Sequence, residues 1–414
     1  MKKLLSIFLL LPLLFFASCS SDDSGDSGKK NQKRGELYSV SNKSAFDYFT
    51  ENNLVGINIG DTFDAHRNGK AGEEVWNKPP VSQALMDGIS GAGFTLVRIP
   101  ITWMDNIGGA PKYTVDKKQL KRIEEVVLMA HNAGLKAIIN MHHDDNDTAT
   151  GGWLSISQSR NPTQKAAIED KYTKAWTQIA KHFKKYGEWL MFESFNEPHY
   201  QNSWETSPDN IDYQTINDWN QAFTNAVRGT GGNNKQRILI IPAYANRRAR
   251  LLDSFFTQPN DTASLRQAVS FHYYDPYPFG QQETNWQGVP TSTWGSQTER
   301  NIIDTHLKQL NDEYINRGIA VIMGECGVVL KLYNSLSEPE RTTRREEARL
   351  SRREYLPFLF STAKKYNISP VFWENGVTTG NGEKFGLFNR RTGAPNDDEE
   401  TQWLINAMID AVKD

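Results

Sequence analysis

The 414-residue chain has only two cysteines and almost no net charge. Its 47 basic and 49 acidic residues give a formal charge of −2, which provides no basic footprint for nucleic acid. We therefore expect no nucleic-acid partner. The sequence also has no glycine-rich phosphate loop and no low-complexity linker after its first tenth. Nothing in it marks a nucleotide site or a second domain.

One apolar run, over residues 4–16, follows two lysines and is too short to span a membrane. This pattern predicts a signal peptide over residues 1–18. The run ends in Phe-Ala-Ser-Cys, which resembles a bacterial lipobox and implies that Cys19 carries a lipid. An ordinary secreted signal peptide is the alternative.

Polar and acidic residues follow Cys19 and predict a flexible tether over residues 19–45. The acidic run directly after the cysteine resembles the surface-export signal of Bacteroidetes lipoproteins. We expect an exported lipoprotein anchored in the outer membrane, at the cell surface. Lipidation of Cys19 leaves Cys326 without a disulfide partner. No His or Asn pattern around Cys326 indicates an activated thiol, and a small buried thiol packs well beside a strand end.

From about residue 50 onward, short apolar runs alternate with amphipathic segments. The runs are almost continuously apolar, which is typical of parallel strands covered on both faces. Eight such repeats favour an α/β fold, a closed (β/α)8 TIM barrel, as one catalytic domain over residues 46–414. The expected strands are residues 55–59, 95–99, 136–141, 189–195, 237–241, 268–273, 319–323 and 370–373.

The segment after Asp116 illustrates the expected helices. Asp116 and Gln119 resemble a capping box, and apolar residues follow at helical spacing from Leu120 to Ala130. Gly134 supplies the stop.

Two of the expected strands lead directly to a glutamate, Glu197 and Glu325. Charged groups are rarely buried without a partner, and the active site of such a barrel lies at the carboxyl ends of its strands. We therefore expect both glutamates in one cleft. Other polar and aromatic residues at strand ends should join them: Asn58, Arg98, His142, His143, Asn196, His272, Tyr274 and Trp373.

A pair of carboxylates between aromatic walls suits glycoside hydrolysis, in which one carboxylic acid protonates the leaving oxygen and the other carboxylate attacks or activates water. Arg98 could keep a nucleophilic glutamate ionised, because a nearby positive charge lowers a carboxyl pKa. Asn196 could bind a sugar 2-hydroxyl, and Tyr274 could orient Glu325. Trp373 offers a flat face for a pyranose ring.

A metal site is the main rival interpretation. Adjacent histidines on a strand point in opposite directions, and the chain has no His-Glu-x-x-His motif or cysteine pair. We therefore expect no metal and no cofactor, although a calcium ion on the Asp-rich loop stays open. The ligand-rich residues are His142, His143, Asp144, Asp145, Asp147 and His272.

Taken together, these motifs resemble glycoside hydrolase family 5, and most closely its endo-β-1,4-glucanase/xyloglucanase branch. The resemblance runs from about residue 50 to about residue 410, in the expected order. It rests on the segments Gly56–Ala65, Val97–Pro100, Asn140–Asp144, Phe192–Pro198, His272–Tyr274, Gly324–Gly327 and Trp373–Gly376.

The resemblance implies a role for each glutamate. Glu197 matches the general acid/base, with Asn196 before it, and Glu325 matches the nucleophile of a retaining double displacement. Retention implies carboxyl groups about 5–5.5 Å apart. The residues implied to line the subsite of cleavage are Arg98, His142, His272, Tyr274 and Trp373.

Four positions depart from the branch's pattern: Asp61, His199, Cys326 and Glu374. None removes a catalytic group, but several lie near the cleft wall, so the preferred polysaccharide stays open. Six tryptophans are candidates either for outer sugar subsites or for the core: Trp76, Trp103, Trp153, Trp204, Trp286 and Trp294.

The expected function is that of a surface-anchored, monomeric, retaining endo-β-1,4-glucanase with an open groove. Its substrates would be cellulosic glucans or xyloglucan, and its contact with the membrane would be the lipid at Cys19. Two alternatives remain at this point: a β-mannanase or mixed-linkage glucanase, and a non-catalytic surface glycan-binding protein.

Overall fold

The computed structural model describes residues 36–145, 150–200, 207–282, 290–380 and 383–413. Its main sheet is a closed barrel of eight parallel strands in the order β1-β10-β9-β8-β7-β6-β5-β4, which confirms the expected fold. Each expected strand is present. The strands are β1 (Gly56–Asn58), β4 (Leu96–Ile99), β5 (Lys136–Ile139), β6 (Leu190–Glu193), β7 (Leu239–Arg247), β8 (Gln267–Tyr273), β9 (Ala320–Cys326) and β10 (Ile368–Phe372).

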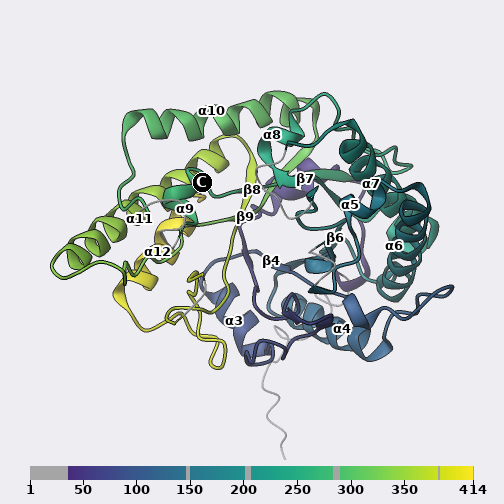
Figure 1. Cartoon of the computed structure of the whole chain (residues 1–414), viewed down its shortest axis with the longest axis horizontal. Helices are drawn as coiled ribbons and strands as arrows, with labels where there is room; N and C mark the ends of the chain where they lie inside the picture. Colours follow the sequence, from purple (N-terminus) through teal and green to yellow (C-terminus); the bar gives the residue numbers. More distant parts are fainter. Residues whose placement is uncertain (1–35, 146–149, 201–206, 283–289, 381–382, 414) are drawn as a thin grey trace, which may run out of the picture.

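Helices surround these strands (Figure 1). A small antiparallel hairpin, β2 (His66–Arg67) and β3 (Lys70–Ala71), follows β1. None of the helices in the described ranges is long and apolar enough to cross a membrane. The α-helices are α2 (Ala45–Glu51), α3 (Gln83–Gly91), α4 (Lys117–Asn132), α5 (Ile156–Ser159), α6 (Pro162–Phe183), α7 (Asn210–Gly229), α8 (Arg248–Leu251), α9 (Tyr277–Gly280), α10 (Gln297–Glu313), α11 (Glu340–Lys365) and α12 (Glu399–Asp410).

Helix α4 shows how the sequence sets these elements. The side chain of Asp116 accepts hydrogen bonds from the backbone N–H groups of Lys118 and Gln119, which satisfies donors that the first turn leaves unpaired. The apolar stripe from Leu120 to Ala130 is buried against the barrel. Gly134 follows with φ of 87°, a left-handed conformation that suits glycine just after a helix.

The strands bury side chains on both faces because successive residues point to opposite sides. On β4, Leu96 belongs to a cluster inside the barrel, whereas Val97 belongs to the layer between strands and helices. The inner cluster also contains Tyr48 and Phe49 of α2. Helix α2 therefore closes the barrel at the amino-terminal ends of the strands, which we call the bottom.

Residues 36–45, which the sequence analysis placed in the tether, lie against this bottom. The carbonyl of Leu37 accepts from the backbone N–H of Gly187 (2.8 Å), and that of Lys43 accepts from Arg266 (2.6 Å). The backbone N–H of Ala45 donates to Leu265 (2.7 Å). These contacts attach residues 36–45 to the barrel.

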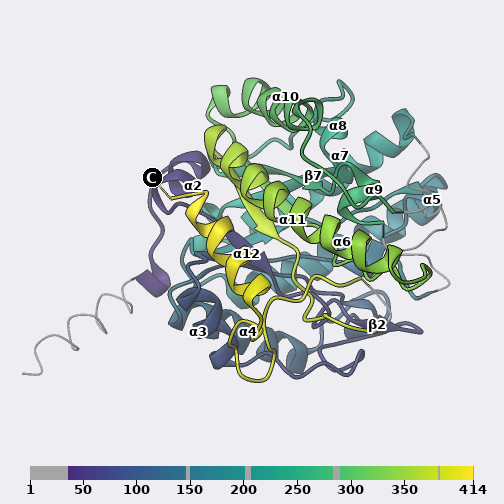
Figure 2. The same ribbon diagram turned by 90° about the vertical axis from the view of Figure 1, so that its left-hand side faces the viewer.

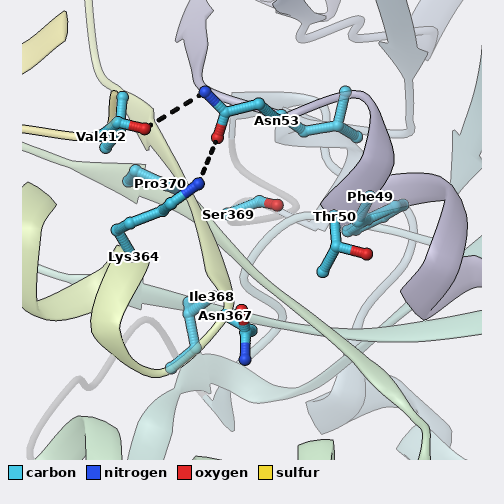
Figure 3. Close-up of a pocket in the computed structure, with 10 residues that line it drawn as sticks. Phe49, Thr50, Asn53, Lys364, Asn367, Ile368, Ser369, Pro370 and Val412 are labelled. Carbon is cyan, nitrogen blue, oxygen red and sulfur yellow. Dashed lines mark hydrogen bonds between the residues drawn. The ribbon is translucent and has the colours of Figure 1, made fainter. Parts of the chain in front are cut away.

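The end of the chain reaches the same place. The amide of Asn53 donates to the carbonyl of Val412 (3.2 Å) and accepts from Lys364 (3.1 Å) beside a small pocket (Figure 3). Figure 2 shows α2 next to the C-terminus. Both ends of the described chain thus lie at the bottom of the barrel, opposite the carboxyl ends of the strands.

Candidate active site

Glu197 and Glu325 lie together at the carboxyl end of the barrel. Glu197 follows β6 and Glu325 is in β9. A carboxylate oxygen of each and a ring nitrogen of His272 all lie within 4.8 Å of one another. Inverting glycosidases keep their carboxyl groups about 6.5–9.5 Å apart to admit water, whereas retaining ones keep them about 5–5.5 Å apart. The arrangement fits retention.

Arg98 organises the floor of this site. Its side chain is completely buried. Nη1 donates to Glu325 (2.7 Å) and to Asn58 (3.0 Å), and Nη2 donates to Asn196 (2.8 Å). Nε donates to Glu193 (2.7 Å). Burial alone would lower the pKa of Arg98, but Glu193 and Glu325 raise it above its ordinary value, so the guanidinium stays charged.

Glu325 is held from two further sides. The hydroxyl of Tyr274 donates to Oε2 at 3.0 Å, and Nδ1 of His272 lies 3.5 Å from the same oxygen. Burial raises the pKa of Glu325, while His272 and Arg98 oppose that rise. Burial also raises the pKa of Tyr274 well above its usual value, so its hydroxyl keeps its proton and remains a donor.

Glu197 has a different environment. Its side chain is 21% exposed, and desolvation in the cleft raises its pKa to about 7. Burial lowers the pKa of His272 to about 4, so that imidazole is neutral at neutral pH. The amide nitrogen of Asn246 lies 3.0 Å from Nε2 of His272, which makes Nε2 the acceptor. Nδ1 then carries the hydrogen and donates to Glu197 at 2.5 Å.

The two carboxyl groups are therefore set for different protonation states. Glu325 faces a guanidinium and a hydroxyl donor, both of which favour its charged form. Burial has the largest effect on Glu197, and its pKa of about 7 leaves it largely protonated in mildly acidic solution. Such a difference in environment assigns acid and base roles to paired carboxylates.

Aromatic rings form one wall. The rings of His142 and Trp373 are parallel, with centroids 5.9 Å apart and an angle of 4° between planes. Nε2 of His142 lies 3.9 Å from Glu325, and burial holds the pKa of His142 well below its ordinary value. His143 continues this wall, 4.7 Å from the ring of His66, which lies 5.5 Å from Trp76.

The expectation that His142 and His143 point in opposite directions is wrong. Strand β5 ends at Ile139, so the alternation of a strand does not apply to the two histidines. Their rings lie 4.5 Å apart. Together with Asp64 they place three possible ligand atoms within 4.8 Å, one of the two such groups in the described ranges.

The Asp-rich loop uses its carboxylates to hold backbone. Asp144 accepts from the backbone N–H groups of Trp103 (2.9 Å) and Met104 (2.8 Å) and from the indole of Trp153. Asp145 accepts from the backbone N–H of Glu197 (2.7 Å). Asp147 lies outside the described residues.

Asn58 and Asn196 differ in their access to a substrate. Asn58 is completely buried behind Arg98, and its amide donates to the carbonyls of Gly324 (2.9 Å) and Phe372 (3.2 Å). It supports Arg98 from below the cleft instead of reaching a sugar. Asn196 accepts from Arg98 through its oxygen, which leaves its amide nitrogen as the end that can donate to a sugar hydroxyl.

The six tryptophans singled out from the sequence fall into three groups. Trp103 and Trp294 are buried core residues, and Trp76 and Trp153 are half-buried. Trp204 and Trp286 lie outside the part of the chain that the structure describes. Cys326 is buried, its thiol donates to the carbonyl of a neighbouring strand, and burial raises its pKa, so it is not an activated nucleophile.

Glu193, Asn140 and Asn246 belong to the site, although no motif in the sequence assigns them a role. Asn140 and Glu193 both belong to the site's buried network, in which the amide of Asn140 donates to Glu193 at 2.9 Å. A signal for Glu193 was present, because a glutamate inside an apolar strand needs a partner. Its partner, Arg98, is far away in the sequence and adjacent only in the closed barrel.

Comparison with known proteins decides the family. A family model described as cellulase (glycosyl hydrolase family 5) matches residues 51–379. The chain belongs to glycoside hydrolase family 5. The match covers the strand ends that carry Arg98, Glu197 and Glu325, and it stops shortly before helix α12.

Similar members of the family are named as enzymes that cleave glucans. Endoglucanase A of Paenibacillus barcinonensis is 34% identical over 378 residues, which cover 87% of this chain and 88% of that protein. The xyloglucan-specific endo-β-1,4-glucanase BoGH5A of Bacteroides ovatus is 33% identical, over 82% of this chain and 66% of that protein.

A solved structure agrees with these relatives. The broad-specificity GH5-4 endoglucanase from Bacteroides salanitronis superimposes with a TM-score of 0.78 at 32% identity, over 91% of this chain and 97% of that one. The comparisons confirm the expected class of enzyme, a family 5 endo-β-1,4-glucanase. They do not favour the β-mannanase or binding-protein alternatives.

Proposed function

We propose that this enzyme cleaves internal β-1,4-glucosidic bonds with retention, using Glu325 as nucleophile and Glu197 as general acid/base. The supporting observation is the separation of their carboxylate oxygens, within 4.8 Å. That spacing lets Glu325 attack the anomeric carbon while Glu197 protonates the leaving oxygen, and leaves no room for a water between carboxylate and sugar.

The electrostatics of the site suit both steps. In the first, Arg98 and Tyr274 stabilise the charged form of Glu325, while Glu197 carries its proton to the departing oxygen. Once Glu325 is bonded to the sugar its charge is gone. The pKa of Glu197 then falls, because a neighbouring negative charge had favoured its protonated form. Glu197 can then take a proton from water in the second step.

The other side chains bind and orient the sugar. The amide nitrogen of Asn196 is placed to donate to a 2-hydroxyl, a hydrogen bond that strengthens in the transition state. Trp373 and His142 present parallel rings as a wall for the pyranose. His143, with His66 and Trp76, extends this wall away from the point of cleavage.

The substrates we propose are cellulosic glucans and xyloglucan. Relatives include both an endoglucanase and a xyloglucan-specific enzyme, so the shared feature is a β-1,4-glucan backbone. No cofactor takes part, and one chain carries both carboxylates.

The test is release of reducing ends from xyloglucan, carboxymethylcellulose, mixed-linkage glucan and glucomannan, with Glu325→Ala as the inactive control. We expect activity on a β-1,4-glucan that Glu325→Ala abolishes. Proton NMR of the first product should show the β-anomer. An α-anomer as first product would contradict retention, and hydrolysis of glucomannan alone would contradict the substrate class.

We further propose that Cys19 is lipidated and holds the enzyme on the outer face of the outer membrane. Residues 36–45 attach to the bottom of the barrel, so a tether that begins at Cys19 meets the domain at the end opposite its cleft. Incorporation of an alkyne fatty acid in the native host should label the protein and be lost in Cys19→Ala. Labelling that persists in Cys19→Ala would contradict this anchor.

A further inference from the structure

A third carboxylate, that of Glu193, lies under the two catalytic ones and takes no part in the steps above. It is the last residue of β6 and is completely buried. Three side chains from three other parts of the barrel donate to it: Arg98 (2.7 Å), Asn140 (2.9 Å) and Ser270 (3.3 Å). A buried charge that is paired and held by further donors has one fixed position.

Glu193 also packs beneath the backbone that carries Glu325. A Cβ atom added at Gly324 would lie 3.0 Å from Oγ of Ser270 and 3.5 Å from Oε1 of Glu193. The approach to the Ser270 hydroxyl would be tight, whereas the approach to the Glu193 carboxylate would be an ordinary van der Waals contact. The backbone at Gly324, directly before the nucleophile, therefore lies against the buried network that holds Glu193.

The guanidinium of Arg98 is consequently shared. One edge, through Nε, binds Glu193, and the two terminal nitrogens reach Glu325 and Asn196. Because the guanidinium is planar, fixing Nε also fixes the directions in which Nη1 and Nη2 point. One positive charge faces two carboxylates, and the negative charge of Glu193 offsets part of the stabilisation that Arg98 gives to the charged form of Glu325.

We propose that Glu193 is a positioning residue for the reaction, which rests on the proposed role of Glu325. It orients Arg98 toward Glu325 and Asn196. Its negative charge also offsets part of the effect of Arg98 on Glu325, so that the nucleophile stays ionised and remains basic enough to attack. Glu193 does not touch the substrate; it acts through Arg98.

A purely structural role would be to neutralise a buried arginine and nothing more. Glu193→Gln separates the two possibilities, because glutamine keeps the size and an acceptor oxygen but removes the charge. The substrate is 2,4-dinitrophenyl β-cellobioside, whose leaving group needs no proton, so the acidic limb of kcat/KM reports the nucleophile. The charged or titratable groups around Glu193 and Glu325 are Arg98, His142, Glu197, His272 and Tyr274.

In Glu193→Gln, Arg98 acts on Glu325 alone, and the acidic limb should move to lower pH by about one unit, a modest shift for a neighbouring charge. A less basic nucleophile should also lower kcat/KM on its plateau. The matched control is Asp261→Asn, which removes the charge of the ion-pair partner of Arg228, in the last turn of α7. It should lower Tm and leave the limb in place. The proposal would be overturned if the acidic limb of the kcat/KM profile did not shift in Glu193→Gln, or if it shifted equally in Asp261→Asn.

A second variant covers the case in which Glu193→Gln does not fold. Glu193→Asp keeps the charge but withdraws the carboxylate by one methylene, so that Nε of Arg98 loses the hydrogen bond that orients the guanidinium. We expect kcat to fall at least tenfold with the acidic limb near its wild-type position, and wild-type kcat would refute the positioning role. Failure of the underlying function is distinguishable, because it would appear as an active Glu325→Ala enzyme.

Discussion

Replacing Glu197 by alanine tests the division of labour between the two carboxylates. The change removes the proton donor while leaving Arg98, Tyr274 and Glu325 in place. Positioned acids and bases contribute about 10²–10⁴-fold, so we expect a loss of that size in kcat/KM on a polysaccharide, whose leaving group is a poor one. The loss should nearly disappear with 2,4-dinitrophenyl β-cellobioside.

The pH dependence gives a second magnitude. With a pKa of about 7, Glu197 is about nine-tenths protonated one unit below that value and about one-tenth one unit above it. The wild-type kcat/KM on a glucan should therefore fall about tenfold between about pH 6 and about pH 8. The sign follows from the role, since the proton must be present in the first step.

The assay measures initial rates of both substrates across this pH range for the wild type and Glu197→Ala. On the glucan, where the wild type should show an alkaline limb, the residual activity of Glu197→Ala should show none between about pH 6 and about pH 8. Its second step also lacks a base, so the glycosyl-enzyme should accumulate as a burst, and azide should relieve the block. An equal loss on both substrates, or an alkaline limb that survives in Glu197→Ala, would refute the assignment.

Two further changes probe the support of the site and of the fold. Tyr274→Phe removes the hydroxyl that donates to Glu325 at 3.0 Å, and we expect about a tenfold fall in kcat with KM little changed; a change confined to KM would contradict an orienting role. Arg237→Ala removes a completely buried guanidinium that donates to the side chain of Asn234 and to several backbone carbonyls, including those of Phe183 and Tyr186. The loss of these charge-assisted hydrogen bonds should cost at least about 3 kcal/mol of unfolding free energy. Thermal unfolding measures this, with the exposed Arg317→Ala as control, which should have no effect.

Much of the fold was predictable because its signal is local. Each strand is an almost continuous apolar run, such as residues 319–323 before Glu325. Polar residues follow these runs at the carboxyl ends of the strands, where the active site of a barrel lies. Helix caps such as Asp116 follow the same logic, since a short polar side chain satisfies the first backbone donors.

What escaped prediction depends on contacts between distant segments. Asn58 stands at a strand end like Asn196, yet only the closed barrel shows that it lies behind Arg98. Residues 36–45 read as a polar tether, but the backbone contacts of Leu37 and Lys43 attach them to the bottom of the barrel. Every residue has a backbone carbonyl, so the residue types do not show which carbonyls will accept a hydrogen bond from a distant segment.

Glu193 shows the same limit at the centre of the site. Its place in an apolar strand indicates that it has a buried partner, but not which one. Strand order supplies the answer, because β5 lies between β4 and β6 and brings Asn140 and Arg98 onto the same carboxylate.

The central claim is that Glu325 forms a covalent bond to the sugar, and trapping that intermediate tests it most directly. The measurement is peptide mass spectrometry after incubation with an activated 2-deoxy-2-fluoro β-cellobioside, which slows the second step more than the first. The account predicts one added fluoroglycosyl group, located on Glu325. A label on Glu197 or Glu193 under conditions of turnover would contradict it.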